Sequence, residues 1–296
     1  MSIVKSFSVE KGDTFYIRHG SDNFSIIDCN LTDDRKDEII AELKTQSSDK
    51  NIVRFISTHP DEDHINGLES LDDSQKIVNF YCVKNNVTKE DETNSFKRYC
   101  KLRDSDKAYF LFKGCSRRWM NSDNEERKSS GINIHWPDLS DKYFKEELEL
   151  AEETGNPNNI SPIISYSMGS IKIVWMGDLE TEYMENIYNS VSLKNITVLF
   201  APHHGRKSGK VPEDFLRILN PKLVIIGEAP SKDLNYYKGY NTITQNTAGD
   251  ITFDIDSSEI DIYVSNKDYE VDFLSNNYKT TFKHYLGSLV SKIKFI

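Results

Sequence analysis

The chain has 296 residues, of which 37% are hydrophobic and 28% are charged, so it can bury the core of a globular protein. Its net charge of −10 argues mildly against a protein that coats nucleic acid through a basic surface, although bound metal ions would add positive charge to a cleft. No apolar run approaches the ~18 residues of a membrane span, and the first residues lack a secretory signal. The four cysteines have no CxxC spacing. We therefore expect a cytoplasmic protein with reduced thiols.

The first part of the chain alternates between strands and turns. Residues Thr14–Arg18 and Phe24–Asp28 predict two strands, which the polar turn Gly20–Asn23 joins as a hairpin. A helical pattern follows over Asp33–Lys44, and the apolar run Ile52–Ile56 then predicts a buried strand.

Residues 84–130 differ from their surroundings because they are polar and rich in lysine. Basic and aromatic residues are interleaved at Phe96–Arg103 and Lys113–Trp119. Such a segment can follow a phosphate backbone and stack bases, or it can be a solvated face over a small apolar cluster, which we slightly favour. In both cases we interpret it as an insertion and not as a separate domain.

The rest of the chain predicts further strands and helices. Strands are expected at Gly131–Pro137, Pro162–Tyr166, Ile171–Trp175, Ile196–Phe200, Leu223–Ile226, Ile260–Val264 and Tyr269–Phe273. Helices are expected at Tyr143–Glu153, Glu180–Tyr188, Glu213–Leu219 and, near the end of the chain, Phe282–Val290.

Three groups of potential metal ligands directly follow apolar strands. They are the run His59-Pro60-Asp61-Glu62-Asp63-His64, the single carboxylate Asp178, and the pair His203-His204. Side chains at strand ends can project from one edge of a layered fold, and like charges packed in a cleft raise each other's pKa or recruit a cation. We therefore expect a binuclear centre bridged by Asp178; the first run alone could also be a solvated acidic loop.

This order of motifs resembles the metallo-β-lactamase fold, and within it the nuclease-like domain of the ComEC competence proteins and their stand-alone hydrolase relatives. Further likeness lies in Val9–Asp13 ("VGQGD" in that subgroup), Ile26–Asp28 ("LLID"), Asn158–Ser161 ("NNxS"), Ala201–Gly205 ("VPHHG") and Asn246–Thr252 ("TDxDGxI"). The resemblance covers residues 7–255 outside the insertion. It implies an α/β (α+β) fold, a four-layer αββα sandwich, as a single domain over residues 1–296 with an insertion at 84–130 and a C-terminal extension at 256–296.

The resemblance also implies a site with two divalent metal ions, Zn²⁺ or Mn²⁺. It assigns His59, Asp61 and Asp178 to one ion, and Asp63, His64, Asp178 and His203 to the other. Asp63 would also orient the attacking hydroxide, and His204 would contact phosphate or donate a proton. Adjacent residues of an extended segment point to opposite faces, so one histidine of the pair is expected to be a ligand, and which one stays open.

The resemblance leaves one metal ligand of the wider fold without a counterpart, because no histidine lies between His135 and His203. Asn159, Ser161 or water could replace it, whereas His135 is expected to be structural. Candidate substrate-binding residues are Asn159, Ser161, Arg206, Lys207 and Ser208.

The implied function is a metal-dependent phosphodiesterase, with a nuclease that cleaves DNA or RNA through a metal-bridged hydroxide as the preferred case. Asp61 stands where the wider fold keeps histidine, which favours phosphodiester over lactam or thioester cleavage. One alternative is hydrolysis of a small substrate, such as a cyclic nucleotide, another phosphodiester, a lactone or a thioester. Another is a non-catalytic effector. The expected partners are nucleic acid or nucleotides, no membrane, and a second copy or another protein bound through the insertion or the extension.

Overall fold

The computed structural model describes residues 1–123 and 125–291, and it is a mixed α/β protein whose strands form two sheets. The strand order is β15-β14-β13-β1-β2-β3-β4-β5-β6 in the first sheet and β12-β11-β10-β9-β8-β7 in the second. Residues 124 and 292–296, which belong to the expected insertion and C-terminal extension, lie outside the described residues.

The first sheet combines antiparallel and parallel pairs. Its strands are β1 (Ser2–Ser6), β2 (Phe15–Arg18), β3 (Asn23–Ile27), β4 (Ile52–Ile56), β5 (Phe80–Cys82), β6 (Ala108–Phe110), β13 (Ile251–Ile255), β14 (Glu259–Val264) and β15 (Tyr285–Val290). The predicted hairpin is confirmed as the antiparallel pair β2–β3. Because β3 and β4 are parallel, the segments that follow them leave the same edge of the sheet.

The second sheet also mixes the two pairings. Its strands are β7 (Ile132–Trp136), β8 (Ile163–Met168), β9 (Ile171–Trp175), β10 (Val198–Phe200), β11 (Leu223–Ile226) and β12 (Thr242–Thr244). The predicted pair at 162–166 and 171–175 is confirmed as the antiparallel hairpin β8–β9. Strands β9, β10 and β11 are parallel, so the residues after β9 and β10 also share one edge.

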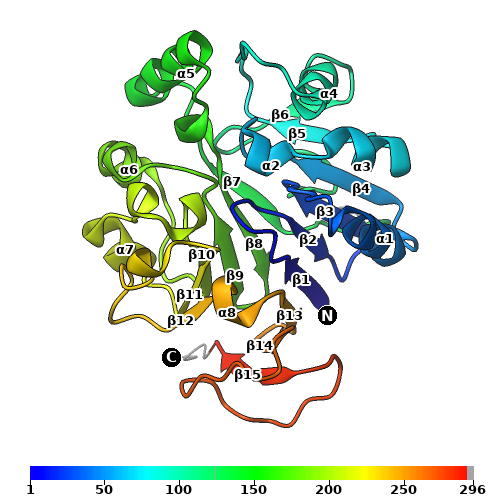
Figure 1. Ribbon diagram of the computed structural model, residues 1–296, viewed down its shortest axis with the longest axis vertical. Helices are drawn as coiled ribbons and strands as arrows, with labels where there is room; N and C mark the ends of the chain where they lie inside the picture. The colour runs from blue at the N-terminus through cyan, green and yellow to red at the C-terminus, as the bar shows by residue number, and fades with distance from the viewer. Residues whose placement is uncertain (124, 292–296) are drawn as a thin grey trace.

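Helices flank the two sheets. They are α1 (Lys36–Ser47), α2 (Glu62–Ile65), α3 (Leu68–Ser74), α4 (Asn94–Arg103), α5 (Lys142–Thr154), α6 (Thr181–Ile187), α7 (Glu213–Leu219) and α8 (Gln245–Ala248). Short 3-10 turns include η1 (Asn158–Ile160), η3 (His203–Gly205) and η4 (Lys207–Gly209). Figure 1 shows α1, α3 and α4 beside the first sheet and α5, α6 and α7 on the opposite side of the molecule. No helix in the described part of the chain is long and apolar enough to cross a bilayer.

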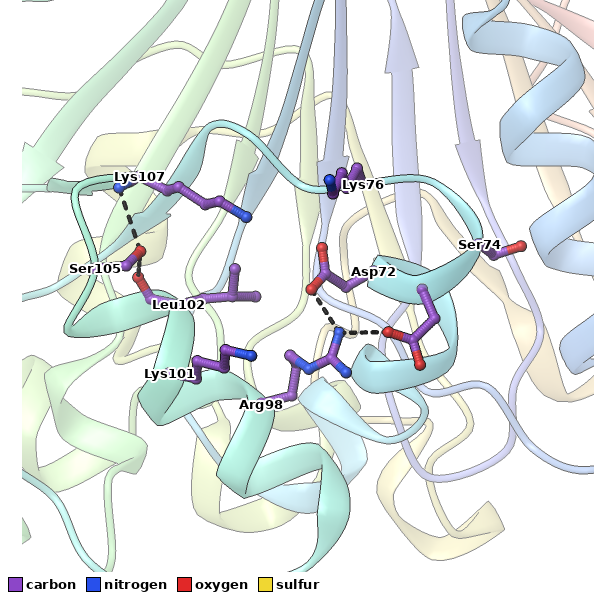
Figure 2. Close-up of a pocket in the computed structure, with 9 residues that line it drawn as sticks. Asp72, Ser74, Lys76, Arg98, Lys101, Leu102, Ser105 and Lys107 are labelled. Atoms are coloured by element: carbon purple, nitrogen blue, oxygen red, sulfur yellow. Dashed lines mark hydrogen bonds and ion pairs between the residues drawn. The ribbon is translucent and has the colours of Figure 1, made fainter.

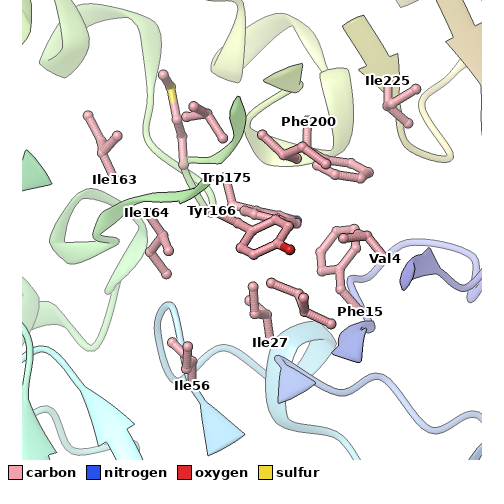
Figure 3. Packing of buried hydrophobic residues seen from close by; sticks show 14 of the residues in the cluster. Val4, Phe15, Ile27, Ile56, Ile163, Ile164, Tyr166, Trp175, Phe200 and Ile225 are labelled. Carbon is pink, nitrogen blue, oxygen red and sulfur yellow. The ribbon is translucent and has the colours of Figure 1, made fainter. Parts of the chain in front are cut away.

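The core between the sheets is aromatic. Phe15 of β2 meets Trp175 of β9 and Phe200 of β10, with ring centroids 6.1 and 4.8 Å apart, and Trp175 stacks on Phe200 at 5.2 Å (Figure 3). All three rings are buried. Large rings packed at these distances hold the two sheets together, and they thereby fix the strand ends of one sheet relative to those of the other.

The insertion adds elements to the first sheet. Strand β6 pairs in parallel with β5 at the end of that sheet, and α4 packs against α2 and α3. Helix α4 buries Phe96, Tyr99 and Leu102 and exposes Lys97 and Lys101. This half of the insertion therefore covers an apolar cluster and presents basic groups outward.

Two predictions near the end of the chain are wrong. The expected helix at Phe282–Val290 is strand β15, which pairs with β14 in antiparallel register, and the expected strand at Tyr269–Phe273 is irregular. The open edge of β14 offers backbone partners to residues 285–290, and this tertiary pairing outweighs local propensity. Tyr269 and Phe273 instead pack against the core from outside the sheets.

Candidate metal centre

The potential ligands that follow separate strands meet at one place. His59 and Asp61 follow β4, Asp63 and His64 belong to α2, Asp178 follows β9, and His203 and His204 follow β10. Strand β4 belongs to the first sheet and β9 and β10 to the second, so the cluster lies where strand ends of both sheets come together.

Asp178 is the carboxylate around which the cluster is arranged. Its Oδ1 lies 3.1 Å from Nε2 of His64, and its Oδ2 lies 3.5 Å from Nε2 of both His203 and His204. Its backbone N–H donates to Oγ of Ser161 at 3.2 Å. Burial alone would raise the pKa of Asp178, but the positive charges of His64 and His204 hold it well below its usual value.

His64 is held between two carboxylates. Its Nδ1 lies 2.9 Å from Oδ2 of Asp28, on the side away from Asp178. Asp28 directly follows β3, and it also accepts hydrogen bonds from the backbone N–H and the hydroxyl of Thr58 at 2.7 and 2.6 Å. A carboxylate behind a histidine is the usual support of a metal-ligating imidazole.

His204 also lies between two carboxylates. Its Nδ1 lies 3.2 Å from Oδ1 of Asp13, and its Nε2 lies 3.4 Å from Oδ2 of Asp63. Burial would lower the pKa of His204, but Asp178 and Asp13 raise it to about 10. The imidazole is therefore protonated without a metal, and an arriving ion has to displace that proton.

Four of these residues could bind one metal ion. One ligand atom from each of Asp13, His64, Asp178 and His204 lies within 4.8 Å of the others. Nε2 of His64, Oδ1 of Asp178 and Nε2 of His204 are buried and make no hydrogen bond of good geometry. Buried polar atoms normally have partners, and imidazole nitrogens and carboxylate oxygens are suitable ligands for Zn²⁺ or Mn²⁺. The residues therefore fit a divalent ion.

His59 lies beside this group. Its Nδ1 is 3.0 Å from the hydroxyl of Thr58 and 3.2 Å from that of Ser161. Its buried Nε2 lies 3.8 Å from Oδ2 of Asp61 and makes no hydrogen bond. Burial and the nearby charge of His64 lower the pKa of His59 well below its usual value. Asp61 itself forms an ion pair with Lys89.

The backbone at His203 and His204 is left-handed, with φ of 51° and 56°, and Gly205 follows at 86°. The expectation of opposite faces assumed an extended segment, and it is wrong, because both imidazoles reach Asp178. His204 is buried, whereas Nδ1 of the more exposed His203 lies 3.1 Å from the Ser208 hydroxyl. Left-handed non-glycine residues cost energy and cluster at functional sites.

The candidate substrate-binding residues occupy different places. Ser161 lies inside the cluster, but the side chain of Asn159 is engaged with Glu147 and Glu180 and is not brought into it. Arg206, Lys207 and Ser208 form the outer part of the loop after His204 and lie at least partly in solvent.

His135 is remote from the cluster. Its Nε2 lies 2.8 Å from the hydroxyl of Ser165 on the neighbouring strand β8. This placement agrees with the structural role expected for it.

Sequence reasoning gave no role to Asp13, Asp28 or Lys89. Asp28 follows an apolar strand, which is the signal that identified Asp178, and Asp13 lies in the motif-like run Val9–Asp13. Lys89 carries no such signal, because its contact with Asp61 depends on how the insertion folds over α2.

A separate surface pocket lies between α3 and α4 and has a volume of about 720 Å³. Figure 2 shows Arg98 paired with Asp72. The side chains of Lys76, Lys101 and Lys107 also line the pocket. None of the clustered histidines lines it. It therefore offers positive charge apart from the metal centre.

Comparisons with known proteins give one distant relative. No protein-family model matches the chain. The chain is 24% identical over 209 residues to ComE operon protein 3 of Bacillus subtilis strain 168, and the match covers 71% of the chain. The chain spans about a quarter of that protein's length, 24%. This weak homology fits the resemblance to ComEC-type proteins.

Proposed function

We propose that the chain is a metal-dependent phosphodiesterase of the metallo-β-lactamase type. The observation that carries the proposal is the group of buried ligand atoms around Asp178 that lack hydrogen-bond partners. Buried imidazole nitrogens and a carboxylate oxygen that make no hydrogen bond cost free energy, and a divalent ion would satisfy them. The distant homology to ComE operon protein 3 supports the same family.

The residues of the cluster divide into metal ligands and groups that act on water or substrate. Asp13, His64, Asp178 and His204 would hold the ion, and a bound divalent ion supplies Lewis acidity and a more acidic water. We assign His204 and not His203 to the ion because His204 is buried and belongs to the group of residues that could hold an ion.

The remaining groups then face the reaction. Asp63 lies next to His204 and can accept a hydrogen bond from the attacking water. His203 stands at the rim, where its imidazole can donate a proton to the leaving oxygen. Arg206, Lys207 and Ser208 follow it on the same loop and can stabilise negative charge on a phosphoryl group.

The preferred substrate is a nucleic acid. The likeness to ComEC competence proteins supports this choice, and the pocket between α3 and α4 adds lysines that suit a phosphate backbone. A small phosphodiester is the second candidate, because the net charge of −10 disfavours a polyanion over most of the surface.

The test compares polymeric and small phosphodiesters on one preparation. Chelator-treated protein receives Mn²⁺ or Zn²⁺ and is assayed with labelled single- and double-stranded DNA, RNA, cyclic nucleotides and a chromogenic phosphodiester. We expect cleavage that requires metal and falls at least about 10³-fold in Asp178→Ala. The matched control is Asp49→Ala, which removes an exposed carboxylate paired with Arg18 and should leave the rate unchanged. Cleavage that survives in Asp178→Ala, or no cleavage of any substrate, would overturn the proposal.

A further inference from the structure

Lys89 brings a fixed positive charge to the side of the cluster formed by His59 and Asp61. Its ammonium group forms an ion pair with Oδ1 of Asp61, while Oδ2 of the same carboxylate lies 3.8 Å from Nε2 of His59. We propose that the chain binds one divalent ion and that the Lys89 ammonium stands beside Asp61 in place of a second ion. This inference rests on the metal centre proposed above.

The segment that carries Lys89 is anchored on both sides. Val87 is buried, and its carbonyl accepts a hydrogen bond from Arg103 at 3.2 Å. On the other side, the hydroxyl of Thr93 donates to Glu62 of α2 at 2.7 Å. The ammonium group is thus delivered to Asp61 by a segment tied to the site helix, unlike a lysine on a free surface loop.

The side of the cluster next to Lys89 is also short of ligands, because the buried, unpaired Nε2 of His59 faces a carboxylate that Lys89 already neutralises. In the described part of the chain, the group able to hold an ion consists of Asp13, His64, Asp178 and His204 and includes neither His59 nor Asp61. Ser161 cannot complete a second set, because its hydroxyl already serves Nδ1 of His59 and the backbone N–H of Asp178.

Charge leads to the same conclusion. An ammonium at hydrogen-bond distance neutralises the Asp61 carboxylate and repels a divalent cation that approaches the same oxygen atoms. At the same place its N–H groups can donate to a phosphoryl oxygen, which is a role that a second ion would otherwise fill. The lysine therefore replaces the ion in charge and in its contact with substrate.

The experiment counts ions without measuring activity. Metal-free wild-type protein is loaded with Mn²⁺, desalted and analysed by elemental analysis and native mass spectrometry. We expect one ion per chain in the wild type and a second ion in Lys89→Ala. The control Lys84→Ala removes an exposed lysine of the same segment, whose amino group lies over the Phe110 ring, and should keep one ion. Asp61→Asn should also keep its ion, with an affinity within about threefold of the wild type, because Asp61 is not among the ligands.

The outcomes separate the inference from the proposed function. Two ions in the wild type, one ion in Lys89→Ala, or loss of the ion in Asp61→Asn would each overturn the inference. A chain that binds one ion and cleaves no phosphodiester supports the inference and overturns the function. Two ions in an active phosphodiesterase support the function and overturn the inference.

Discussion

Asp28 determines how His64 meets the metal centre. It is buried, and it receives hydrogen bonds from His64 and from Thr58, so its position is fixed by three donors. Burial raises the pKa of Asp28, and the hydrogen bond and charge of His64 oppose that rise. The imidazole is thereby held with Nε2 directed at Asp178.

We expect Asp28→Asn to lower metal affinity by about 10- to 100-fold, because the amide supports the imidazole less well than a carboxylate. Competition with a fluorescent chelator measures the affinity, and circular dichroism checks the fold. Asp49→Asn, which changes an exposed carboxylate, is the matched control. An affinity within twofold of the wild type in Asp28→Asn would show that the contact is only structural.

Gly177 controls the position of Asp178. Its φ is +50°, and a Cβ atom at this residue would lie 2.5 Å from the hydroxyl oxygen of Ser161. Alanine would therefore introduce both a strained backbone and a steric clash with a residue that contacts Asp178.

A pair of variants separates these two effects. Gly114 has a φ of +76° with open space around its Cβ position, so Gly114→Ala carries backbone strain alone and should cost about 1 kcal/mol. Gly177→Ala should lower the unfolding free energy by about 2–4 kcal/mol and weaken metal binding. Urea unfolding measures the free energy of unfolding of both variants. Equal losses in the two variants would mean that the clash with Ser161 is relieved at no cost.

Arg54 links β4 to its neighbours from inside the protein. The guanidinium donates to Asn23 at 2.6 Å and Ser25 at 3.0 Å on β3, and to the backbone carbonyl of Trp119 in the insertion at 3.1 Å. The side chain is 1% exposed. One residue therefore holds the insertion to the strand that leads into His59.

Removing this guanidinium should destabilise the protein, because its three acceptors would be left buried. We expect Arg54→Ala to lower the unfolding free energy by about 2–4 kcal/mol. The control Arg217→Ala removes an exposed arginine that pairs with Asp214 within α7, and its cost should stay below about 0.5 kcal/mol. Chemical denaturation monitored by tryptophan fluorescence compares them, and a loss below 1 kcal/mol in Arg54→Ala would contradict the proposed link.

Some elements could be located from sequence because short-range signals mark them on both sides. Strands β4 and β11 and helix α7 have the predicted bounds, since apolar runs there end in polar, proline or glycine residues. Strand β15 could not be located, because its conformation depends on pairing with β14. An apolar run of that length is compatible with helix or strand until its neighbour is known.

The site shows the same division. Asp178 and His64 could be expected to meet because each follows a strand whose end lies at a shared edge. The relation of His203 to His204 could not be predicted, since it depends on two left-handed residues that no local pattern identifies. The approach of Lys89 to Asp61 joins residues from separate segments and requires the complete fold.

The metal centre requires the whole molecule, because its ligands come from both sheets. Asp13 and His64 belong to the first sheet and its connections, whereas Asp178 and His204 follow strands of the second. The aromatic packing of Phe15 against Trp175 and Phe200 holds these two halves together. Stability of the sheet packing is therefore a condition for metal binding.

Imidazoles whose pKa is lowered in the folded protein make that stability depend on pH. Burial and the charge of Lys172 lower the pKa of His135 from 6.5 to about 4, and burial together with Arg54 lowers the pKa of His19 well below its usual value. Each residue binds a proton more readily in the unfolded chain. Their contribution to stability is therefore complete above pH 6.5 and is lost as the pH falls toward the pKa of the folded state.

For His135 the loss falls between pH 6.5 and about pH 4, before most surface carboxylates titrate. We expect His135 to lower the unfolding free energy by about 1–2 kcal/mol between pH 7 and pH 5. Urea unfolding of metal-free protein at both values should show that His135→Asn loses less stability than the wild type on acidification. His284→Asn replaces an exposed imidazole at a positive φ that asparagine tolerates, and should keep the wild-type dependence. If His135→Asn also keeps the wild-type dependence of stability on pH, protons taken up at His19 or at the metal ligands cause the acid sensitivity.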